Sequence, residues 1–581
     1  MPDDAPPAPP EPPKLEDLQH WTWVLGKAQQ MMLEQGIDAL EKAPAVPAMQ
    51  AMMDPTAAMA ATANFWADSM ALWQRFLDPE HAKPFEETPE QARDKRFKAK
   101  QWREEPVFDF LRQSYFTIAD HMLKGVDALE GVDDKQKDQI RFATRGLIDA
   151  MSPSNFPTTN PEVIDKVIET KGESLLKGLQ HMMADLQKGQ MTQVDPDAFE
   201  LGRNLAMTPG KVVKRTDLYE LIQYSPATES VYKVPLIIFP PWINRFYILD
   251  LTPEKSFIRW AVEQGLTVFV VSWKSADASM KDVVWDDFIE QGQIDAIDTV
   301  REMLGVEGVH TIGYCVAGTT LAATLAVLHA RGQAEKVKSA TFFTAQVDFS
   351  EAGELLHFVT DDQLEMIKSL GAEGFLDGRY MATTFNLLRG RDLIWSYVTN
   401  NYLMGQDYAP FDLLHWNSDV TNLPAKWHMD YLTDLYRDNK LAQAGALSVS
   451  GTPIDLGVVK TPSYVQAGRE DHIAPAASVW KITHHFKGPL KFVLAGSGHI
   501  AGVVNPPSSG KYQYWTNDRK VETLAEFFEG ASETKGSWWP DWIGWIDSVD
   551  AEKVPAKGAR VAGKGKSKAL GDAPGSYVKT R

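Results

Sequence analysis

The chain has 581 residues, of which 44% are hydrophobic and 24% are charged. This length is enough for two or three domains, and the composition is typical of a globular protein rather than of a disordered one. The formal net charge of −19 argues against a dedicated nucleic-acid-binding protein, which normally has a basic surface. The single cysteine, Cys315, excludes internal disulfides and cysteine-based zinc clusters and is consistent with a reducing cytosol.

The N-terminal third of the sequence predicts a leader followed by a helical domain. Residues 1–14 are proline-rich and acidic, which predicts disorder and does not resemble a signal peptide. Residues 15–193 are rich in good helix formers, and no apolar stretch of the chain suits a transmembrane helix. The predicted helices are 21–43, 57–76, 108–129, 134–151 and 163–188. Methionine and aromatic side chains on the first two either pack among themselves or form a docking face.

Residues 194–550 predict an α/β domain. Short β-branched or aromatic runs alternate here with helical stretches, which is the pattern of a mostly parallel sheet covered on both faces. The predicted strands are 235–239, 267–272, 309–312, 340–344, 463–467 and 491–494. An aromatic-rich helical insertion at about 349–447 predicts a cap over the carboxyl edge of the sheet. Residues 551–581 contain eight basic and two acidic residues and predict a flexible basic tail, with contact to an anionic surface as the alternative.

The segment around Cys315 has the pattern of a nucleophile elbow. A predicted strand at 309–312 runs into Gly313-Tyr-Cys-Val-Ala-Gly318, and an Ala/Leu-rich helix follows. Small residues must flank a strained nucleophile so that the strand and the helix approach closely. Ala317 stands where a second glycine is usual, with Gly318 directly behind it. At a helix N-terminus the dipole favours a thiolate, so Cys315 is the predicted nucleophile.

Two later loops supply the acid and the histidine in the order that an elbow requires. Asp471 follows the predicted strand 463–467, and His499 follows the predicted strand 491–494 in a glycine-rich loop. Both positions lie at the carboxyl edge of the predicted sheet, beside Cys315. His499 is therefore the predicted general base, and Asp471 either orients the imidazole or accepts a proton from an incoming hydroxyl.

The remaining histidines of this region give weaker signals. His472 adjoins Asp471, where it is a candidate to assist. His484 and His485 lie on a predicted helix without the spacing of a metal site, so the sequence predicts no metal. Neither a phosphate-binding loop nor a dinucleotide-binding fingerprint is present.

The segment 239–244 (FPPWIN) follows the first strong strand, where this fold supplies an oxyanion-hole amide. The backbone N–H of Trp242 or Ile243, together with that of Val316, is predicted to stabilise a tetrahedral intermediate.

From about Asp94 to Trp545 the sequence resembles the class I poly(3-hydroxyalkanoate) synthases, which belong to the α/β-hydrolase superfamily. The motifs that carry the resemblance include PPWIN at 240–244, GYCV at 313–316, REDHI at 469–473, SGHIAG at 497–502 and GSWWPDW at 536–542. The resemblance implies a helical N-terminal domain followed by an α/β-hydrolase domain with a helical cap insertion.

The resemblance also implies a function. It implies that (R)-3-hydroxyacyl-CoA, with short-chain monomers such as 3-hydroxybutyryl-CoA, is polymerised into polyhydroxyalkanoate with release of CoA. The catalytic triad falls on Cys315, Asp471 and His499, with a covalent acyl-cysteine intermediate and no cofactor beyond the CoA thioester. Ala317 and Trp242 depart from residues found in some members, which affects oxyanion geometry or substrate preference.

Partners and binding residues follow from the same resemblance. Asn244 and Arg389 are candidates for binding the CoA end of the substrate, with surface or scaffold roles as the alternative, and Trp416 and His472 are further candidates. The expected partners are the growing polyester chain, the surface of storage granules in the cytoplasm with their associated proteins, and a second copy of the chain in a homodimer. The N-terminal helices are expected to provide granule docking and to stabilise the dimer.

Two other functions remain open at this point. A cysteine-dependent α/β-hydrolase, either an acyl-CoA thioesterase or a polyester depolymerase, would use the same triad with water as acceptor. A catalytically idle granule-coat protein would use the fold alone.

Overall fold

The computed structural model describes residues 55–78, 85–129, 131–565 and 568–580, with the backbone alone for residues 55–62. The chain divides into two compact units. The helical unit is Met1–Asp195 with Thr383–Ala409, and the sheet unit is Pro196–Ala382 with Pro410–Arg581. The predicted leader at 1–14 and the predicted helix at 21–43 lie outside the described residues.

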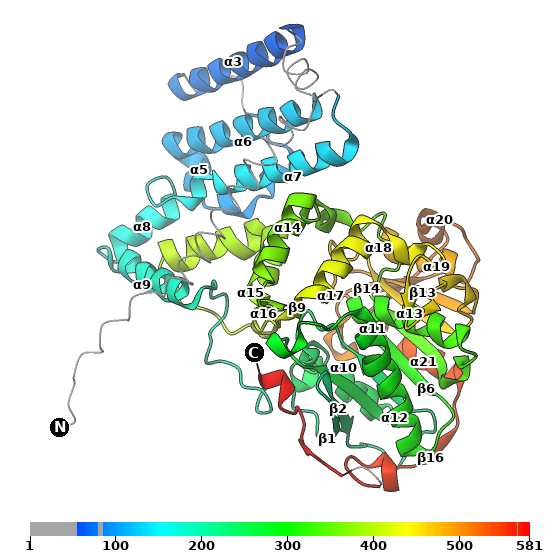
Figure 1. Cartoon of the computed structure of the whole chain (residues 1–581). Helices are drawn as coiled ribbons and strands as arrows, with labels where there is room; N and C mark the ends of the chain where they lie inside the picture. The colour runs from blue at the N-terminus through cyan, green and yellow to red at the C-terminus, as the bar shows by residue number, and fades with distance from the viewer. Residues whose placement is uncertain (1–54, 79–84, 130, 566–567, 581) are drawn as a thin grey trace, which may run out of the picture. The chain divides into compact units, whose positions relative to one another are not determined.

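The helical unit contains long helices close to the predicted bounds. They are α3 (Pro55–Leu77), α6 (Pro106–Asp127), α7 (Asp134–Ala150), α8 (Pro161–Glu169) and α9 (Glu173–Lys188), with the short α4 (Pro89–Ala92) and α5 (Gln101–Glu104). Figure 1 shows α3, α6 and α7 side by side. The predicted helix 163–188 is divided in two, because Lys171 and Gly172 both have positive φ angles, of 53° and 89°. None of the described helices is both long enough and apolar enough to cross a bilayer.

The insertion between the fourth and fifth predicted strands is shared between the two units. Residues 383–409, which include the π-helical turns η9 (Arg391–Trp395) and η10 (Val398–Leu403), pack on the N-terminal helices. Gly178 of α9 lies so close to Tyr402 that a side chain at 178 would overlap its carbonyl group. Arg391 also pairs with Asp149 of α7 at 3.0 Å. The other residues of the predicted cap pack in the sheet unit.

The sheet unit is built on an 11-stranded mixed sheet of order β15-β14-β13-β12-β7-β6-β4-β5-β2-β1-β17. The six strands from β13 to β5 are parallel and correspond to the six predicted strands. They are β4 (Leu236–Phe239), β5 (Val268–Trp273), β6 (Val309–Tyr314), β7 (Val337–Phe343), β12 (Ser463–Gly468) and β13 (Leu490–Ala495). Antiparallel strands that were not predicted extend both edges: β1 (Gly210–Arg215), β2 (Tyr219–Tyr224), β14 (Gln513–Thr516), β15 (Ser532–Lys535) and β17 (Gly571–Asp572).

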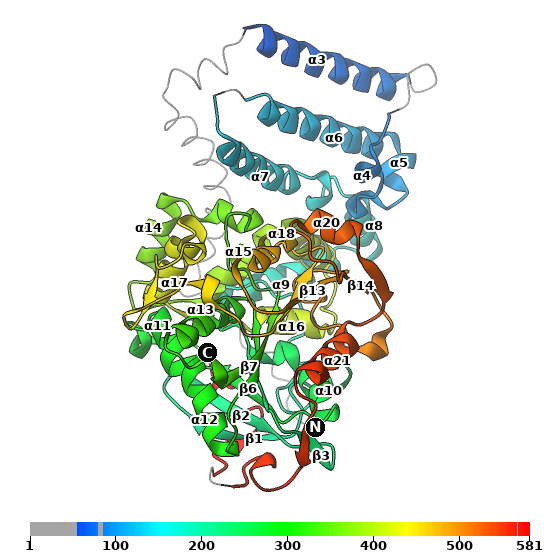
Figure 2. The ribbon, with the colours of Figure 1, turned by 90° about the vertical axis from the view of Figure 1, so that its right-hand side faces the viewer.

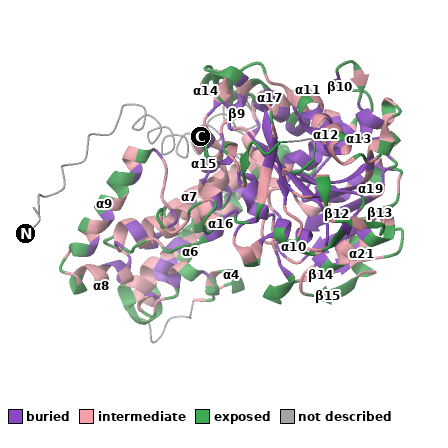
Figure 3. Cartoon of the chain, turned by 90° about the horizontal axis from the view of Figure 1, so that it is seen from below, coloured by how far each residue is buried: buried purple, intermediate pink, exposed green. Residues whose placement is uncertain are grey.

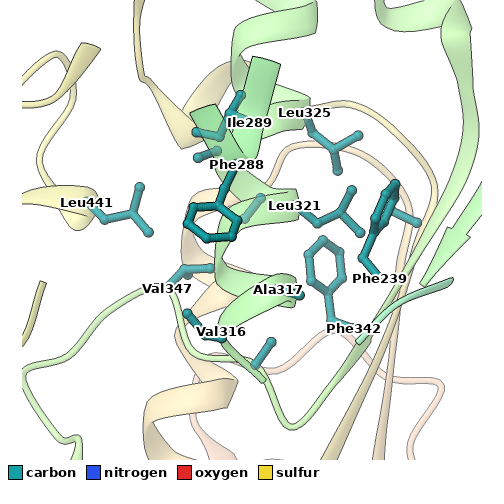
Figure 4. Packing of buried hydrophobic residues seen from close by; sticks show 14 of the residues in the cluster. Phe239, Phe288, Ile289, Val316, Ala317, Leu321, Leu325, Phe342, Val347 and Leu441 are labelled. Atoms are coloured by element: carbon teal, nitrogen blue, oxygen red, sulfur yellow. The ribbon is translucent and has the colours of Figure 1, made fainter. Parts of the chain in front are cut away.

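Helices cover both faces of this sheet. Figure 2 shows α12 (Asp295–Leu304) and α13 (Val316–Ala330) on one side and α10 (Phe257–Glu263) and α21 (Trp539–Val549) on the other. Alternate residues of each central strand enter two separate hydrophobic clusters, so the strands are buried on both faces (Figure 3). Figure 4 shows Val316, Ala317 and Leu321 of α13 among Phe239 and Phe342 of the sheet and Phe288. This packing fixes the start of α13 against the ends of β4 and β7.

The described part of the basic tail is ordered against the sheet unit, which differs from the flexible tail expected from its composition. Strand β16 (Lys553–Pro555) pairs with β3 (Ser230–Tyr232), and β17 pairs with β1. Val578 is buried in a hydrophobic cluster. Backbone pairing and a few buried contacts hold this segment. Because these contacts do not need many apolar residues, the composition of the segment gave no sign of them.

Candidate active site

Cys315 occupies a strained turn between β6 and α13. Its φ and ψ angles are 53° and −127°, a conformation that residues with a side chain rarely adopt. The turn is held by backbone hydrogen bonds: Cys315 N–H donates to Phe343 O at 2.9 Å, and Gly318 N–H donates to Cys315 O at 2.8 Å. Cys315 is half-buried. This is the geometry expected of a nucleophile elbow.

Gly318 provides the close approach of strand and helix at this elbow. A Cβ atom added at Gly318 would lie 2.7 Å from Gly313 O and would overlap the side chain of Ala345. A Cβ atom added at Gly313 would lie 2.5 Å from the Gly318 Cα atom. The two glycines therefore face each other, and Ala317 instead packs into the hydrophobic core (Figure 4).

The structure brings His499 and Asp471 together in the buried region beside the elbow. The His499 Nδ1 atom lies 2.8 Å from Asp471 Oδ2. Because a carboxylate only accepts, Nδ1 carries the hydrogen and Nε2 is left to act on Cys315. Tyr314, the residue before Cys315, donates its hydroxyl to His499 O at 3.0 Å, and the Cys315 charge acts on the imidazole. The structure thus brings the three predicted triad residues to the same place.

The acid itself is fully engaged. Asp471 Oδ1 accepts the backbone N–H groups of Ile473 at 2.8 Å and Ala474 at 2.9 Å, while Oδ2 accepts from His499. The Asp471 side chain has no exposed surface. This arrangement fixes the orientation of the imidazole and leaves Asp471 without contact to solvent.

The loops that carry the acid and the histidine are tied to each other. Arg469 N–H donates to Ala495 O at 2.8 Å, and Glu470 N–H donates to Ser497 O at 3.1 Å. A Cβ atom added at Gly468 would lie 2.8 Å from Ser497 O, so glycine permits this close approach. Because β12 and β13 are adjacent and parallel, the loops that follow them meet at the carboxyl edge of the sheet.

The environment of His499 favours its protonated form. Burial lowers the pKa of this imidazole, but the negative charges of Asp471 and Cys315 and the hydrogen bonds to both outweigh burial and raise the pKa to about 10. The site therefore holds a positively charged imidazolium close to the elbow.

The candidate oxyanion residues lie next to the elbow. Phe239 at the end of β4 is in register with Gly313 of β6, so the loop 240–244 starts beside the nucleophile. Val316 is the first residue of α13, where backbone N–H groups have no partner within the helix. The Trp242 ring stacks on Phe288 with centroids 3.9 Å apart, and Ile243 packs against the same cluster.

The candidate substrate-binding residues lie in different environments. Trp416 is buried, and its indole N–H donates to Arg245 O at 2.7 Å, which leaves no donor on this side chain for a ligand. Asn244 Oδ1 accepts from the backbone of Arg245 at 2.7 Å. His472 is half-buried beside Asp471. Arg389 is exposed and belongs to the helical unit, whereas the triad belongs to the sheet unit.

Two tyrosines near the nucleophile were not predicted as site residues. Tyr431 and Tyr436 lie in the π-helical segment η11 (Tyr431–Arg437), are buried, and pack edge to face with ring centroids 5.4 Å apart. Gln346 Nε2 also donates to the Tyr436 hydroxyl at 3.2 Å. Burial and the nearby Cys315 charge both raise the pKa values of these tyrosines, which places two neutral hydroxyl groups in the electrostatic surroundings of the sulfur.

Among the described residues, no group of three His, Cys, Asp or Glu side chains has the arrangement of a metal site.

Comparison with known proteins gives two matches to family models. The description "Poly-beta-hydroxybutyrate polymerase (PhaC) N-terminus" matches residues 93–261, and "alpha/beta hydrolase fold" matches residues 239–506. The mixed sheet, the elbow and the order of the triad residues agree with the second description. The sheet unit is an α/β-hydrolase domain, and the predicted fold class is confirmed.

Curated relatives cover most of the chain. The poly(3-hydroxyalkanoate) polymerase subunit PhaC of Rhizobium meliloti (strain 1021) is 45% identical over 536 residues, which span 91% of this chain and 87% of the relative. The poly(3-hydroxyalkanoate) polymerase of Methylorubrum extorquens is 43% identical over 91% of this chain and 88% of its own length. The PhaC subunit of Cupriavidus necator is 42% identical over 89% and 87%.

This chain therefore belongs to the poly(3-hydroxyalkanoate) polymerase family. Its class is that of the acyltransferases, and the predicted family and enzyme class are both confirmed.

Proposed function

We propose that this chain polymerises short-chain (R)-3-hydroxyacyl-CoA, such as 3-hydroxybutyryl-CoA, through an acyl group held covalently on Cys315. The observation that carries the proposal is the hydrogen bond between Asp471 and His499 beside Cys315, which lies at a strained elbow. The polymerase relatives support the same reaction class. The reaction needs no cofactor beyond the CoA thioester.

The first half-reaction loads the enzyme. The Cys315 sulfur bonds to the thioester carbonyl carbon, the bond from that carbon to the CoA sulfur breaks, and His499 passes the thiol proton to the departing CoA. The backbone N–H groups of Val316 and of Trp242 or Ile243 stabilise the oxyanion that forms in between.

The second half-reaction extends the polyester. The 3-hydroxyl oxygen of another hydroxyacyl group attacks the acyl carbon on Cys315, and the bond from that carbon to sulfur breaks. The hydroxyl proton passes to His499 Nε2 and then to the departing sulfur. His499 rather than Asp471 takes this proton, because both Asp471 oxygens already accept hydrogen bonds and its side chain has no exposed surface.

Water must be kept from the acyl-enzyme, since hydrolysis would make the protein a thioesterase. The buried rings of Tyr431 and Tyr436 support this exclusion, because they come from the insertion and the Cys315 charge acts on both. Trp427, also from the insertion, is buried as well. Trp427 stacks on Tyr431 with centroids 5.1 Å apart and contacts Trp242 of the oxyanion loop.

We also propose that the protein acts in the cytoplasm on the surface of polyester granules, as a homodimer. Four large apolar side chains on α3 are exposed and recur at helical spacing: Trp66, Met70, Trp73 and Leu77. Such a stripe suits an apolar polymer surface or a second copy of the chain. Replacing Trp66 and Met70 by Gln should release the protein from sedimented granules, and undiminished sedimentation would contradict this role.

One assay separates polymerase from hydrolase. The protein is incubated with 3-hydroxybutyryl-CoA, and both the release of CoA and the acyl product are followed. A polymerase gives CoA and insoluble polyester, whereas a thioesterase gives CoA and free hydroxy acid. Polyester formation that persists in a Cys315→Ala variant would overturn the covalent proposal.

A further inference from the structure

Glu220 of β2 binds the segment 571–580, here termed the Tyr577 segment. The Glu220 side chain is fully buried, and its carboxylate accepts the backbone N–H groups of Ser576 at 2.8 Å and Tyr577 at 3.0 Å. It also accepts the Ser576 hydroxyl at 2.7 Å and Arg215 Nε at 2.7 Å. Burial raises the pKa of Glu220, but these hydrogen bonds outweigh it and hold the pKa below its usual value.

The fit of the Tyr577 segment on the sheet is specific. Gly575 has a φ of 86°, and a side chain there would overlap the Glu220 carboxylate. The Tyr577 hydroxyl donates to Thr216 O at 2.6 Å, and Val578 is buried. The segment is therefore held by side-chain, backbone and apolar contacts together.

The Tyr577 segment also touches the loop that follows β4. Arg245 Nη1 donates to Tyr577 O at 3.1 Å, and the Arg245 side chain is 1% exposed. Arg245 directly follows Asn244, the last residue of the candidate oxyanion loop 240–244. At its other end this loop begins after Phe239, which is in register with Gly313 beside the nucleophile.

Other contacts to Arg245 make it the anchor of this loop. Trp416 Nε1 donates to Arg245 O at 2.7 Å, and Asp419 lies 3.5 Å from Arg245 Nε. These contacts hold the backbone and the near part of the side chain, while Tyr577 O binds the far end of the guanidinium. A loop fixed at both ends keeps its N–H groups at constant distances from Cys315.

We propose that Glu220 and Arg245 are positioning residues, which use the Tyr577 segment to hold the oxyanion loop 240–244 in place for acyl transfer. The inference rests on the proposed function, in which this loop stabilises the oxyanion of the thioester reaction. Neither residue touches the reacting atoms, so their effect is on the loop rather than on the sulfur.

The test compares two reactions of the same cysteine. Attack on the thioester passes through an oxyanion, whereas alkylation of Cys315 by iodoacetamide does not. In Glu220→Gln, and in a variant that lacks residues 571–581, kcat for CoA release should fall about 10- to 100-fold, less than the loss of one whole oxyanion donor. The KM and the alkylation rate should stay within about twofold of wild type, because neither substrate binding nor the reactivity of the Cys315 sulfur depends on the position of this loop.

Two controls make the outcome decisive. Glu552→Gln removes a carboxylate that pairs with Lys233 at 2.8 Å, elsewhere in the C-terminal region, and should keep the wild-type kcat. A synthetic peptide of residues 571–581 added to the truncated variant should restore kcat, and a scrambled peptide should not. Unchanged kcat, or a parallel loss of alkylation, would overturn the inference, whereas a wild-type protein that releases no CoA would overturn the proposed function instead.

Discussion

Asp471 and His499 lie on loops that follow two adjacent parallel strands, and Asp471 Oδ2 is 2.8 Å from His499 Nδ1. The carboxylate thus has two consequences for the imidazole. It accepts the hydrogen bond of Nδ1, which in the proposed function leaves Nε2 to act on Cys315, and together with the Cys315 charge it raises the His499 pKa to about 10. Replacing the Asp471 carboxylate by an amide of the same shape removes its charge and separates these two effects from the effect of burial on His499.

Asp471→Asn should shift the pH dependence of Cys315 reactivity. Without the carboxylate the His499 pKa falls, so less imidazolium stabilises the thiolate near neutral pH. As the pH is lowered, the rate of alkylation by iodoacetamide should therefore begin to fall at a higher pH in the variant than in wild type. The kcat of the variant should fall by about 10²–10⁴-fold. The readout is unambiguous because Cys315 is the only cysteine.

Asp541→Asn is the matched control for this experiment. Asp541 accepts hydrogen bonds from Tyr464 at 2.9 Å and from Lys491 at 2.6 Å. Its substitution therefore also removes a hydrogen-bonded carboxylate. Its alkylation profile should match that of wild type. A profile for Asp471→Asn that coincides with wild type would show that Asp471 does not govern His499.

The same raised pKa makes a stability prediction with a defined sign. The imidazole has a pKa of about 6.5 when unfolded and about 10 when folded. Protonated His499 therefore stabilises the fold fully below about pH 6.5, and this contribution is lost as the pH rises toward 10. Urea unfolding of wild type and Asp471→Asn should show their difference in unfolding free energy shrinking over that range. A difference that grows with pH would contradict the assignment.

Replacing the nucleophile tests the chemistry of the sulfur. Cys315→Ala should abolish CoA release, by up to about 10⁶-fold, as removing a triad nucleophile does elsewhere. Cys315→Ser should be severely impaired, since a serine hydroxyl has no comparable ionised fraction near neutral pH. The urea concentration at the midpoint of unfolding, followed by circular dichroism, should be close to that of wild type for both variants. Substantial CoA release from Cys315→Ser would argue against a thiolate mechanism.

Gly318→Ala should distort the elbow. The added Cβ atom would lie 2.7 Å from Gly313 O and overlap Ala345, so overpacking should cost about 1–3 kcal/mol of unfolding free energy. Activity should fall with it, because Cys315 is displaced. Ala317→Gly is the comparison: it should cost about 1 kcal/mol in helix propensity and keep most activity. Gly318→Ala with wild-type stability and activity would refute the close-approach argument.

Tyr436→Phe should weaken the nucleophile. The Cys315 charge acts on the buried Tyr436 hydroxyl, and a polar hydroxyl near the sulfur is expected to contribute about 0.5–1.5 kcal/mol, or about 2–10-fold in rate. The alkylation rate near neutral pH should drop accordingly. Tyr464→Phe, which removes a hydroxyl bonded to Asp541, should not change it. Equal effects of the two substitutions would mean that the Tyr436 hydroxyl acts only through packing.

The sequence predicted those parts of the fold that depend on local patterns. The six central strands are continuous apolar runs because they are buried on both faces, and the elbow and its partners follow strand ends in a fixed order. Edge strands such as β15 were missed because all four of its residues are exposed, so no apolar pattern marks them. The break at 171–172 was missed because good helix formers surround Gly172, and the positive φ of Lys171 has no sequence signal of its own.

Two functional features depend on contacts that residue patterns do not encode. Tyr431 and Tyr436 are five residues apart, which places them on different faces of an α-helix, and the π-helical segment brings their rings into contact. The Tyr577 segment is rich in small residues and carries no net charge, yet one buried carboxylate, Glu220, binds its backbone. Both features become visible only in three dimensions.

The most direct test of the account is to find where the acyl group is held. The protein is mixed with 3-hydroxybutyryl-CoA, quenched in acid within one turnover, digested and analysed by tandem mass spectrometry. The account predicts that the peptide containing Cys315 gains the mass of one hydroxyacyl unit or of a short oligomer, and that Asp471→Asn accumulates less of this adduct. Turnover with an unmodified Cys315 peptide, or with the acyl group on another residue, would contradict it.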